Sequence, residues 1–201
     1  YRMFKPSPYS KDEIKSRLGL PDDKPIILFF GFIRPYKGLS DLLKALKIIH
    51  TKESDIHLLV AGEFWDSRAL YDDQIQSFGL KDYVHIFDKY IPDDEVAQFF
   101  LAADLFVAPY TGGTQSGSLK SALGFGLPAV VTSTISDKLV RNLPELCEII
   151  PPGKPQEMAN AIIKKLNSPL MEENQIKIFF ENSWEALMAS LIDIPRIKSS
   201  L

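Results

Sequence analysis

The sequence predicts an α/β domain whose parallel sheet carries helices on both faces, and two observations indicate this. Short apolar runs, typical of strands that are buried on both sides, recur along the chain. Between them lie longer segments whose apolar residues repeat at helical spacing, such as Leu39, Leu42, Leu43, Leu46 and Ile49. Strands that alternate with helices in this way form right-handed βαβ units, and such units build a parallel sheet.

The expected elements follow one another in regular alternation. About six strands are expected, over residues 25–33, 56–61, 84–87, 104–108, 129–132 and 147–150. Helices are expected over residues 11–18, 39–49, 69–78, 94–102 and 116–125. A further helix begins at Pro155, where a missing N–H is tolerated, and the last spans 171–191 with Asn182 or Ser183 as its N-cap. Together these elements predict a Rossmann-like, doubly wound sheet.

The composition fits one large domain. The chain has 201 residues, of which 45% are hydrophobic and 24% are charged, so it is long enough to bury a core. We expect residues 1–24 to form a linker and a short helix, and residues 25–195 to form the ligand-binding domain. Because the first residue is not Met and the opening segment contains Pro and Ser, we expect the chain to be the C-terminal piece of a longer protein.

Charge and residue usage exclude several classes of function. The net charge of -3 provides no basic surface for nucleic acid. No apolar stretch approaches the roughly 20 residues that span a bilayer, and the first residues do not form a signal peptide, so a soluble protein is expected. The single cysteine, Cys147, lies in an apolar run and is expected to be a small buried hydrophobe, which favours a reducing, cytoplasmic location.

The sequence predicts no metal site and no bound cofactor. His50, His57 and His85 are scattered over one helix end and two strands, so we expect them to pack or to lie on the surface. Neither a dinucleotide fingerprint nor a P-loop is present. No catalytic triad or carboxylate pair follows from the spacing, and we interpret Asp104 as a helix-to-strand junction residue.

Two loops mark the expected ligand site. In a doubly wound sheet with strand order 3-2-1-4-5-6, ligands bind beyond the carboxyl ends of the first and fourth strands. Here those ends lead into loops over residues 31–38 and 109–118, which are expected to converge. Glu63, Trp65 and Asp66 follow the second strand on the same edge and are candidates to reach a ligand.

The first loop carries two cations between two glycines. Gly31 and Gly38 allow close approach of the backbone, Arg34 offers a planar fork of donors, and Lys37 offers a compact charge. This combination suits phosphate oxygens. The alternative is that both charges are simply solvated.

The second loop is rich in Gly, Thr and Ser and runs directly into a helix. Its free N–H groups and the helix dipole therefore converge on one place that favours phosphate. The alternative is an ordinary capped turn in which Thr114 or Ser116 is only the N-cap.

Several motifs in this order resemble a known family. They include Gly31 to Gly38, Leu59 to Glu63, Tyr90 to Asp93, Ala103 to Tyr110, Thr114 to Gly117, and Gly126 to Val131. The set resembles the C-terminal, donor-binding domain of GT-B glycosyltransferases, specifically the retaining glycosyltransferase family 4 (glycosyl transferases group 1). The resemblance covers the chain from about Pro25 to the region of Trp184.

The resemblance implies half of a GT-B fold and a hexosyltransferase-type enzyme. This half is expected to bind the diphosphate of a nucleotide sugar for retaining transfer to an acceptor such as a polysaccharide or glycolipid precursor. By this resemblance, a preceding N-terminal domain, absent from this chain, is expected to hold the acceptor, to make any membrane contact of a peripheral protein, and to be needed for activity. GT-B enzymes generally need no metal for transfer, so the nucleotide sugar is the expected small-molecule partner.

The resemblance also assigns residues. Arg34 and Lys37 are the expected catalytic cations, and the nucleobase is expected near Tyr90 and Ile91, with a packed aromatic as the alternative for Tyr90. The other expected substrate-binding residues are Gly31, Phe32, Gly113, Thr114, Gln115, Ser116, Gly117 and Ser121.

The sequence departs from the family at three positions. The usual family arginine aligns with Phe32, so its role is assigned to Arg34, the nearest guanidinium in the loop. Two family glutamates, which hold the sugar and the ribose, align with Gly113 and Ser121. A non-catalytic scaffold domain that binds sugar nucleotides is therefore one alternative function. A sugar-nucleotide epimerase of similar two-domain fold is another, although residues 34–38 and 103–110 fit it less well.

Overall fold

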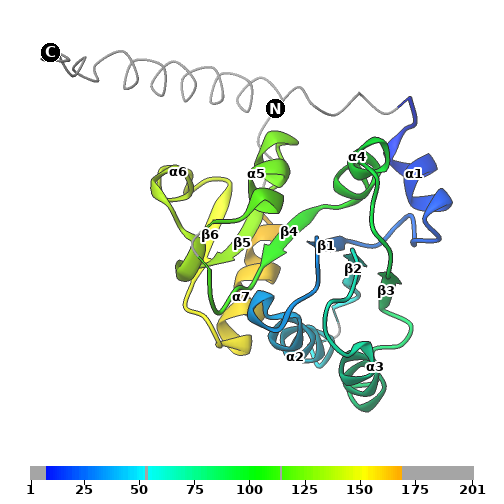
Figure 1. Cartoon of the computed structure of the whole chain (residues 1–201), viewed down its shortest axis with the longest axis horizontal. Helices are drawn as coiled ribbons and strands as arrows, with labels where there is room; N and C mark the ends of the chain where they lie inside the picture. Colours follow the sequence, from blue (N-terminus) through cyan, green and yellow to red (C-terminus); the bar gives the residue numbers. More distant parts are fainter. Residues whose placement is uncertain (1–7, 53, 114, 169–201) are drawn as a thin grey trace, which may run out of the picture. The chain divides into compact units, whose positions relative to one another are not determined.

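A single parallel sheet forms the centre of the described structure. The computed structural model describes residues 8–52, 54–113 and 115–168. Within these residues, six strands pair in the order β3-β2-β1-β4-β5-β6 (Figure 1), as expected for a doubly wound sheet. The strands are β1 (Ile26–Phe30), β2 (His57–Ala61), β3 (Val84–Phe87), β4 (Leu105–Ala108), β5 (Ala129–Thr132) and β6 (Cys147–Ile150).

Helices cover both faces of this sheet, so the predicted Rossmann-like architecture is confirmed. Figure 1 shows α2 (Leu39–His50), α3 (Arg68–Ser77) and α7 (Pro155–Leu166) on one side of it. On the other side lie α1 (Lys11–Arg17), α4 (Asp93–Ala102) and α5 (Gly117–Gly124). The short helix α6 (Lys138–Arg141) lies beside β6, and two short 3-10 helices, η1 (Pro35–Lys37) and η2 (Ser133–Ile135), complete the described elements.

Each face of the sheet packs a different kind of core. Alternate strand residues such as Phe29, Leu58 and Val107 join a mostly aliphatic cluster with the apolar faces of α2 and α7. On the opposite face the core is aromatic, and Phe100 contacts the rings of Phe30, Phe106 and Phe125 at centroid distances of 4.9, 6.1 and 5.2 Å. Because strand side chains alternate between faces, the continuous apolar runs of the sequence supply both cores at once.

The first strand is shorter than the sequence predicts. It was expected to reach Ile33, but it ends at Phe30 because Gly31 adopts φ +103, which breaks the extended backbone. Ile33 instead forms an isolated parallel bridge with Phe64. The chain beyond β1 is therefore tied to the chain beyond β2.

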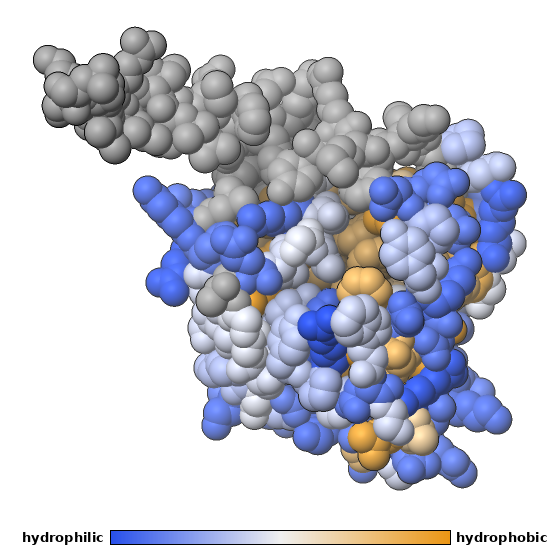
Figure 2. Space-filling view, viewed as in Figure 1, coloured by the Kyte–Doolittle hydropathy of each residue, from blue (hydrophilic) through white to orange (hydrophobic). Residues whose placement is uncertain are grey.

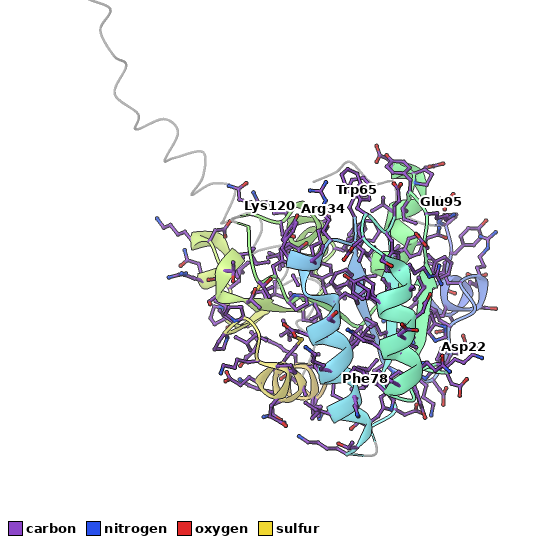
Figure 3. The ribbon with its side chains drawn as sticks, turned by 60° about the horizontal axis from the view of Figure 1, so that its bottom comes forward. Asp22, Arg34, Trp65, Phe78, Glu95 and Lys120 are labelled. Atoms are coloured by element: carbon purple, nitrogen blue, oxygen red, sulfur yellow. The ribbon has the colours of Figure 1, made fainter. Side chains whose placement is uncertain are left out.

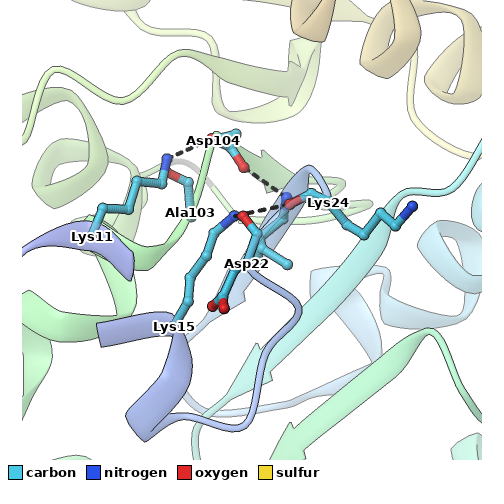
Figure 4. Close-up of polar contacts among 7 residues, drawn as sticks. Lys11, Lys15, Asp22, Lys24, Ala103 and Asp104 are labelled. Atoms are coloured by element: carbon cyan, nitrogen blue, oxygen red, sulfur yellow. Dashed lines mark hydrogen bonds and ion pairs between the residues drawn. The ribbon is translucent and has the colours of Figure 1, made fainter. Parts of the chain in front are cut away.

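Lysine side chains connect the first helix, α1, to the segment before β1 and to Asp104 (Figure 4). The Nζ of the buried Lys15 donates to the carbonyl oxygens of Asp22 and Lys24, at 3.1 and 2.9 Å. Lys11 forms an ion pair with Asp104, whose other carboxylate oxygen accepts the N–H of Ile26 at 2.8 Å. Asp104 lies between α4 and β4, so its interpretation as a junction residue is confirmed.

Some expectations fall outside the described residues, namely the helix over 171–191 with its Asn182 or Ser183 cap, and Thr114.

In the part of the chain that the structure describes, no helix combines the length and the apolar character needed to cross a membrane. Figure 2 shows a largely hydrophilic surface on the visible face, with apolar residues confined to small areas.

Candidate functional site

The loops that follow β1 and β4 meet at the carboxyl edge of the sheet, as expected. The carbonyl oxygen of Tyr36 accepts hydrogen bonds from the backbone N–H and the hydroxyl of Thr111, at 2.7 and 3.2 Å. The rings of Tyr36 and Tyr110 lie edge to face at 6.0 Å. A Cβ on Gly38 would come 2.0 Å from the carbonyl oxygen of Pro109, so only a glycine allows this approach.

Lys37 is a buried cation within this junction. Lys37 is only 8% exposed, and no carboxylate of the described residues lies within 4.0 Å of its amine. Burial, together with the charge of Arg34, lowers the pKa of Lys37 to about 8. The alternative of a solvated loop charge is therefore wrong for Lys37, and an unneutralised cation here favours an anionic ligand.

A hydroxyl group lies beside that cation. A Cβ on Gly31 would come within 2.9 Å of Lys37 Nζ and 3.1 Å of Ser118 Oγ, so both groups border the same small space above Gly31. Ser118 is in the first turn of α5, where backbone N–H groups have no partner in the helix. An ammonium, a hydroxyl and first-turn N–H groups together form a set of donors suited to phosphate oxygens.

Ser116 has a structural role in this arrangement. It is the N-cap of α5, where its Oγ accepts the N–H of Leu119 at 3.1 Å, and it lies 3.2 Å from the Tyr110 hydroxyl. The capped-turn interpretation is therefore confirmed for Ser116, while Gln115 and Gly117 beside it are exposed. The cap thus fixes the start of α5, the helix whose first turn carries Ser118.

Arg34 is held in a different way from Lys37. Its guanidinium carbon lies 4.1 Å from the centroid of the Trp65 ring, and that ring contacts Phe32 at 4.6 Å. No carboxylate of the described residues lies within 4.0 Å of the guanidinium. Figure 3 places Arg34 and Trp65 together, at the end of the sheet opposite Phe78.

The remaining predicted residues have diverse environments. Tyr90 is 61% exposed, so the packed-aromatic alternative is wrong for it, whereas the next residue, Ile91, is buried. Gly113 takes φ +91 beside the Tyr36 ring, and Ser121 is half-buried on α5. Sequence reasoning placed Ser118 in the ligand loop but did not name it as a contact, and it missed the contact between Arg34 and Trp65. The only feature of the sequence that indicated Ser118 was its position at the start of a helix that follows a glycine-rich loop.

The histidines lie away from this edge and have packing roles, as expected. His57 and His85, on the neighbouring strands β2 and β3, are joined by a hydrogen bond of 3.0 Å, and His50 bonds the carbonyl oxygen of Ile56. Across the described residues, no group of three or more His, Cys, Asp or Glu side chains is arranged to hold a metal ion. Cys147 is buried, and burial raises the pKa of its thiol to about 12, so it is a core residue.

Fold and site define the class: a doubly wound α/β domain whose switch point carries a buried lysine, Lys37, and a neighbouring arginine, Arg34, without a carboxylate partner among the described residues. The chain belongs to the family described as glycosyl transferases group 1, which matches residues 24–168. Among its relatives is the phosphatidyl-myo-inositol mannosyltransferase of Mycobacterium leprae (strain TN), 28% identical over 160 residues. That alignment covers 79% of this chain and 41% of the mannosyltransferase. The chain spans less than half the length of the curated relatives that it matches.

Solved structures of glycosyltransferases share the fold. The C-terminal domain of the group 1 glycosyl transferase LpcC from Francisella tularensis has a TM-score of 0.71 and 17% identity, covering 83% of this chain and 87% of that domain. Anabaena Alr3699/HepE in complex with UDP has a TM-score of 0.70 and 18% identity, covering 93% of this chain and 54% of that one. The expected half of a GT-B fold is thus confirmed.

Proposed function

We propose that this chain is the donor domain of a glycosyltransferase and binds the diphosphate of a nucleotide sugar at the junction of the β1 and β4 loops. One observation carries the proposal: the buried Lys37 and the neighbouring Arg34 are two cations without a carboxylate partner among the described residues. Like charges at close range repel, and an anion between them removes that cost. The hydroxyl of Ser118 and the first turn of α5 supply further donors.

The same groups account for a transfer step. When the bond from the sugar to the diphosphate breaks, negative charge grows on the leaving diphosphate oxygen. Lys37, Arg34 and the N–H groups around Gln115 to Gly117 stabilise that charge, because donors held in place in a partly buried site gain strength without reorganising. Transfer by this route requires no side-chain nucleophile from this domain, and we assign retention of configuration and the hexose to the complete enzyme.

A nucleoside diphosphate is the first ligand to test. Anabaena Alr3699/HepE, which shares the fold, is described in complexes with UDP, with UDP-glucose, and with UDP and glucose. In this chain we place the nucleobase near Tyr90 and Ile91, beyond the end of β3. We assign the acceptor, a polysaccharide or glycolipid precursor, to a preceding domain, which would also make any membrane contact. The buried lone Cys147 supports a cytoplasmic location.

A second candidate is a non-catalytic domain that binds sugar nucleotides. It is favoured by one observation, the absence of a carboxylate at Gly113 and Ser121. It predicts nucleotide binding by the longer protein without sugar transfer and without hydrolysis of the donor. Measuring release of the nucleoside diphosphate from a panel of nucleotide sugars, with and without acceptors, separates the two candidates.

Calorimetry on the 201-residue chain tests the binding site. We expect UDP, GDP or ADP to bind, and Lys37→Ala to weaken that binding at least tenfold, since a charge-assisted hydrogen bond is lost. Lys81→Ala is the matched control, because it removes the same charge from an exposed site just before β3, at the opposite edge of the sheet. If none of the three nucleotides binds, or if Lys37→Ala binds as tightly as Lys81→Ala, the assignment is wrong.

A further inference from the structure

Trp65 is a largely exposed aromatic residue at this edge of the sheet. It is 55% exposed, although a tryptophan side chain gains much more from burial in a core. Its ring packs instead between loop residues, with Phe32 at 4.6 Å and the guanidinium of Arg34 at 4.1 Å. The contact of this exposed ring with a cation, and not with the core, therefore points to a role at the site.

The backbone explains how the two side chains come together. The N–H of Ile33 donates to the carbonyl oxygen of Glu63 at 2.9 Å, and the N–H of Trp65 donates to that of Ile33 at 3.0 Å. These bonds extend the parallel pairing of β1 and β2 past the end of both strands. Because extended residues alternate in direction, Phe32 and Arg34 share one side while Ile33, fully buried, points into the core.

The geometry of the contact leaves Arg34 able to bind an anion. A carboxylate partner would neutralise the guanidinium and occupy its donors. Here the guanidinium carbon lies over the Trp65 ring, 4.1 Å from its centroid. A ring that stacks on the face of a guanidinium leaves its five in-plane N–H donors free. The ring also removes rotamers from a long side chain, whose ordering would otherwise oppose binding.

We propose that Trp65 is a positioning residue that holds the Arg34 guanidinium by its face and directs its in-plane donors toward the ligand diphosphate. The inference rests on the diphosphate site proposed above. It adds a specific dependence: Trp65 contributes to nucleotide affinity through Arg34 and not through its own contact with the ligand.

A double-mutant cycle on the 201-residue chain tests this dependence. UDP affinity is measured by calorimetry for the unsubstituted chain, Trp65→Ala, Arg34→Ala and the double variant. We expect Trp65→Ala to weaken binding roughly 3- to 30-fold. In the Arg34→Ala background the same change should cost less than about twofold, because the group that Trp65 positions is gone. Trp65→Phe, which keeps an aromatic face, should restore most of the affinity.

Two controls separate positioning from damage to the fold. Leu70→Ala truncates another exposed apolar side chain, 56% exposed on α3, and should leave UDP affinity unchanged. A fluorescence measurement covers the case in which Trp65→Ala unfolds. In a Trp184→Phe chain, Trp65 is the sole tryptophan, and UDP should shift its emission unless Arg34 is replaced by Ala.

The outcomes distinguish this inference from the proposed function. If UDP binds and Arg34→Ala weakens it while Trp65→Ala does not, the positioning role is overturned and the diphosphate site stands. If Trp65→Ala costs as much with Ala at position 34 as with Arg, Trp65 acts on the ligand itself and the inference is equally overturned. If the unsubstituted chain binds no nucleoside diphosphate, the proposed function fails and this inference fails with it.

Discussion

The carbonyl oxygen of Pro109 lies 2.0 Å from the position that a Cβ on Gly38 would occupy. Gly38 joins η1 to α2, and Pro109 directly follows β4, so this contact sets the distance between the two loops of the site. Gly38 also has φ +77, a left-handed backbone that disfavours other residues.

Gly38→Ala should therefore lower both stability and nucleotide binding. Backbone strain and the clash with Pro109 together should reduce the free energy of unfolding by about 2–4 kcal/mol, as measured by urea denaturation. Gly79→Ala is the control, because Gly79 has φ +71 but nothing within 4 Å of the added Cβ. It should cost only about 1 kcal/mol and leave UDP binding intact. Equal losses for the two variants would contradict this explanation.

Nucleotide binding should weaken as the pH rises from about 7 to 9. Burial and Arg34 lower the pKa of Lys37 to about 8, so the free chain loses this charge in that range, whereas a bound diphosphate raises the pKa again. Binding at pH 8 should take up about half a proton per UDP. Calorimetry in two buffers of different ionisation enthalpy measures this uptake. It should vanish in Lys37→Met, and its absence from the unsubstituted chain would contradict the buried-cation assignment.

Asp104 should matter more for stability than the ion pair that it forms. Its carboxylate accepts the N–H of Ile26 at the start of β1, so Asp104→Ala leaves that group without its partner and should cost about 1–3 kcal/mol. Asp104→Asn retains an acceptor and should cost less. Lys11→Met removes a partly exposed ion pair and the hydrogen bond from Lys11 Nζ to the carbonyl oxygen of Ala103, but it leaves the N–H of Ile26 paired, so it should cost about 1 kcal/mol. The free energies of unfolding of the variants are measured by thermal or urea denaturation. A larger loss for Lys11→Met than for Asp104→Ala would contradict this explanation.

The paired histidines should make the fold less stable in mild acid. Burial lowers the pKa of both His57 and His85 below 6.5, with Asp55 opposing the shift at His57 and His57 adding to it at His85. As the pH falls, the unfolded chain therefore gains protons before the folded chain does. The free energy of unfolding should be highest above about pH 7.5 and decrease between pH 7 and 5.5. Urea titrations at several pH values measure this slope.

A chain with both His57→Gln and His85→Gln is the matched comparison for that slope. It should lose most of the pH dependence in this window while the carboxylates, which titrate lower, remain charged. A slope that persists in the double variant would assign the effect to other groups.

The strands and helices could be predicted from the sequence because the patterns that indicate them are local. Continuous apolar runs, helical stripes such as that of α2, and Pro155 at the start of α7 each report on a few neighbouring residues. The strand order then followed from the limited number of ways in which βαβ units can be wound. The premature end of β1 at Gly31 was missed, because the apolar residues that continue to Ile33 conceal a change in backbone conformation.

The amino-acid pattern alone was enough to place two cations and a helix N-terminus at one edge of a parallel sheet. It was not enough to show how each cation is held. Lys37 is buried beside Gly31 and Ser118, and Arg34 lies over the Trp65 ring. The contacts with Ser118 and Trp65 join segments that are far apart in the chain. Such contacts depend on loop conformation and on which residues face each other across the folded sheet, and neither leaves a periodic signal in the sequence. Tertiary packing therefore decided that Lys37 is a desolvated cation and that Arg34 contacts an aromatic ring with no carboxylate of the described residues as its partner.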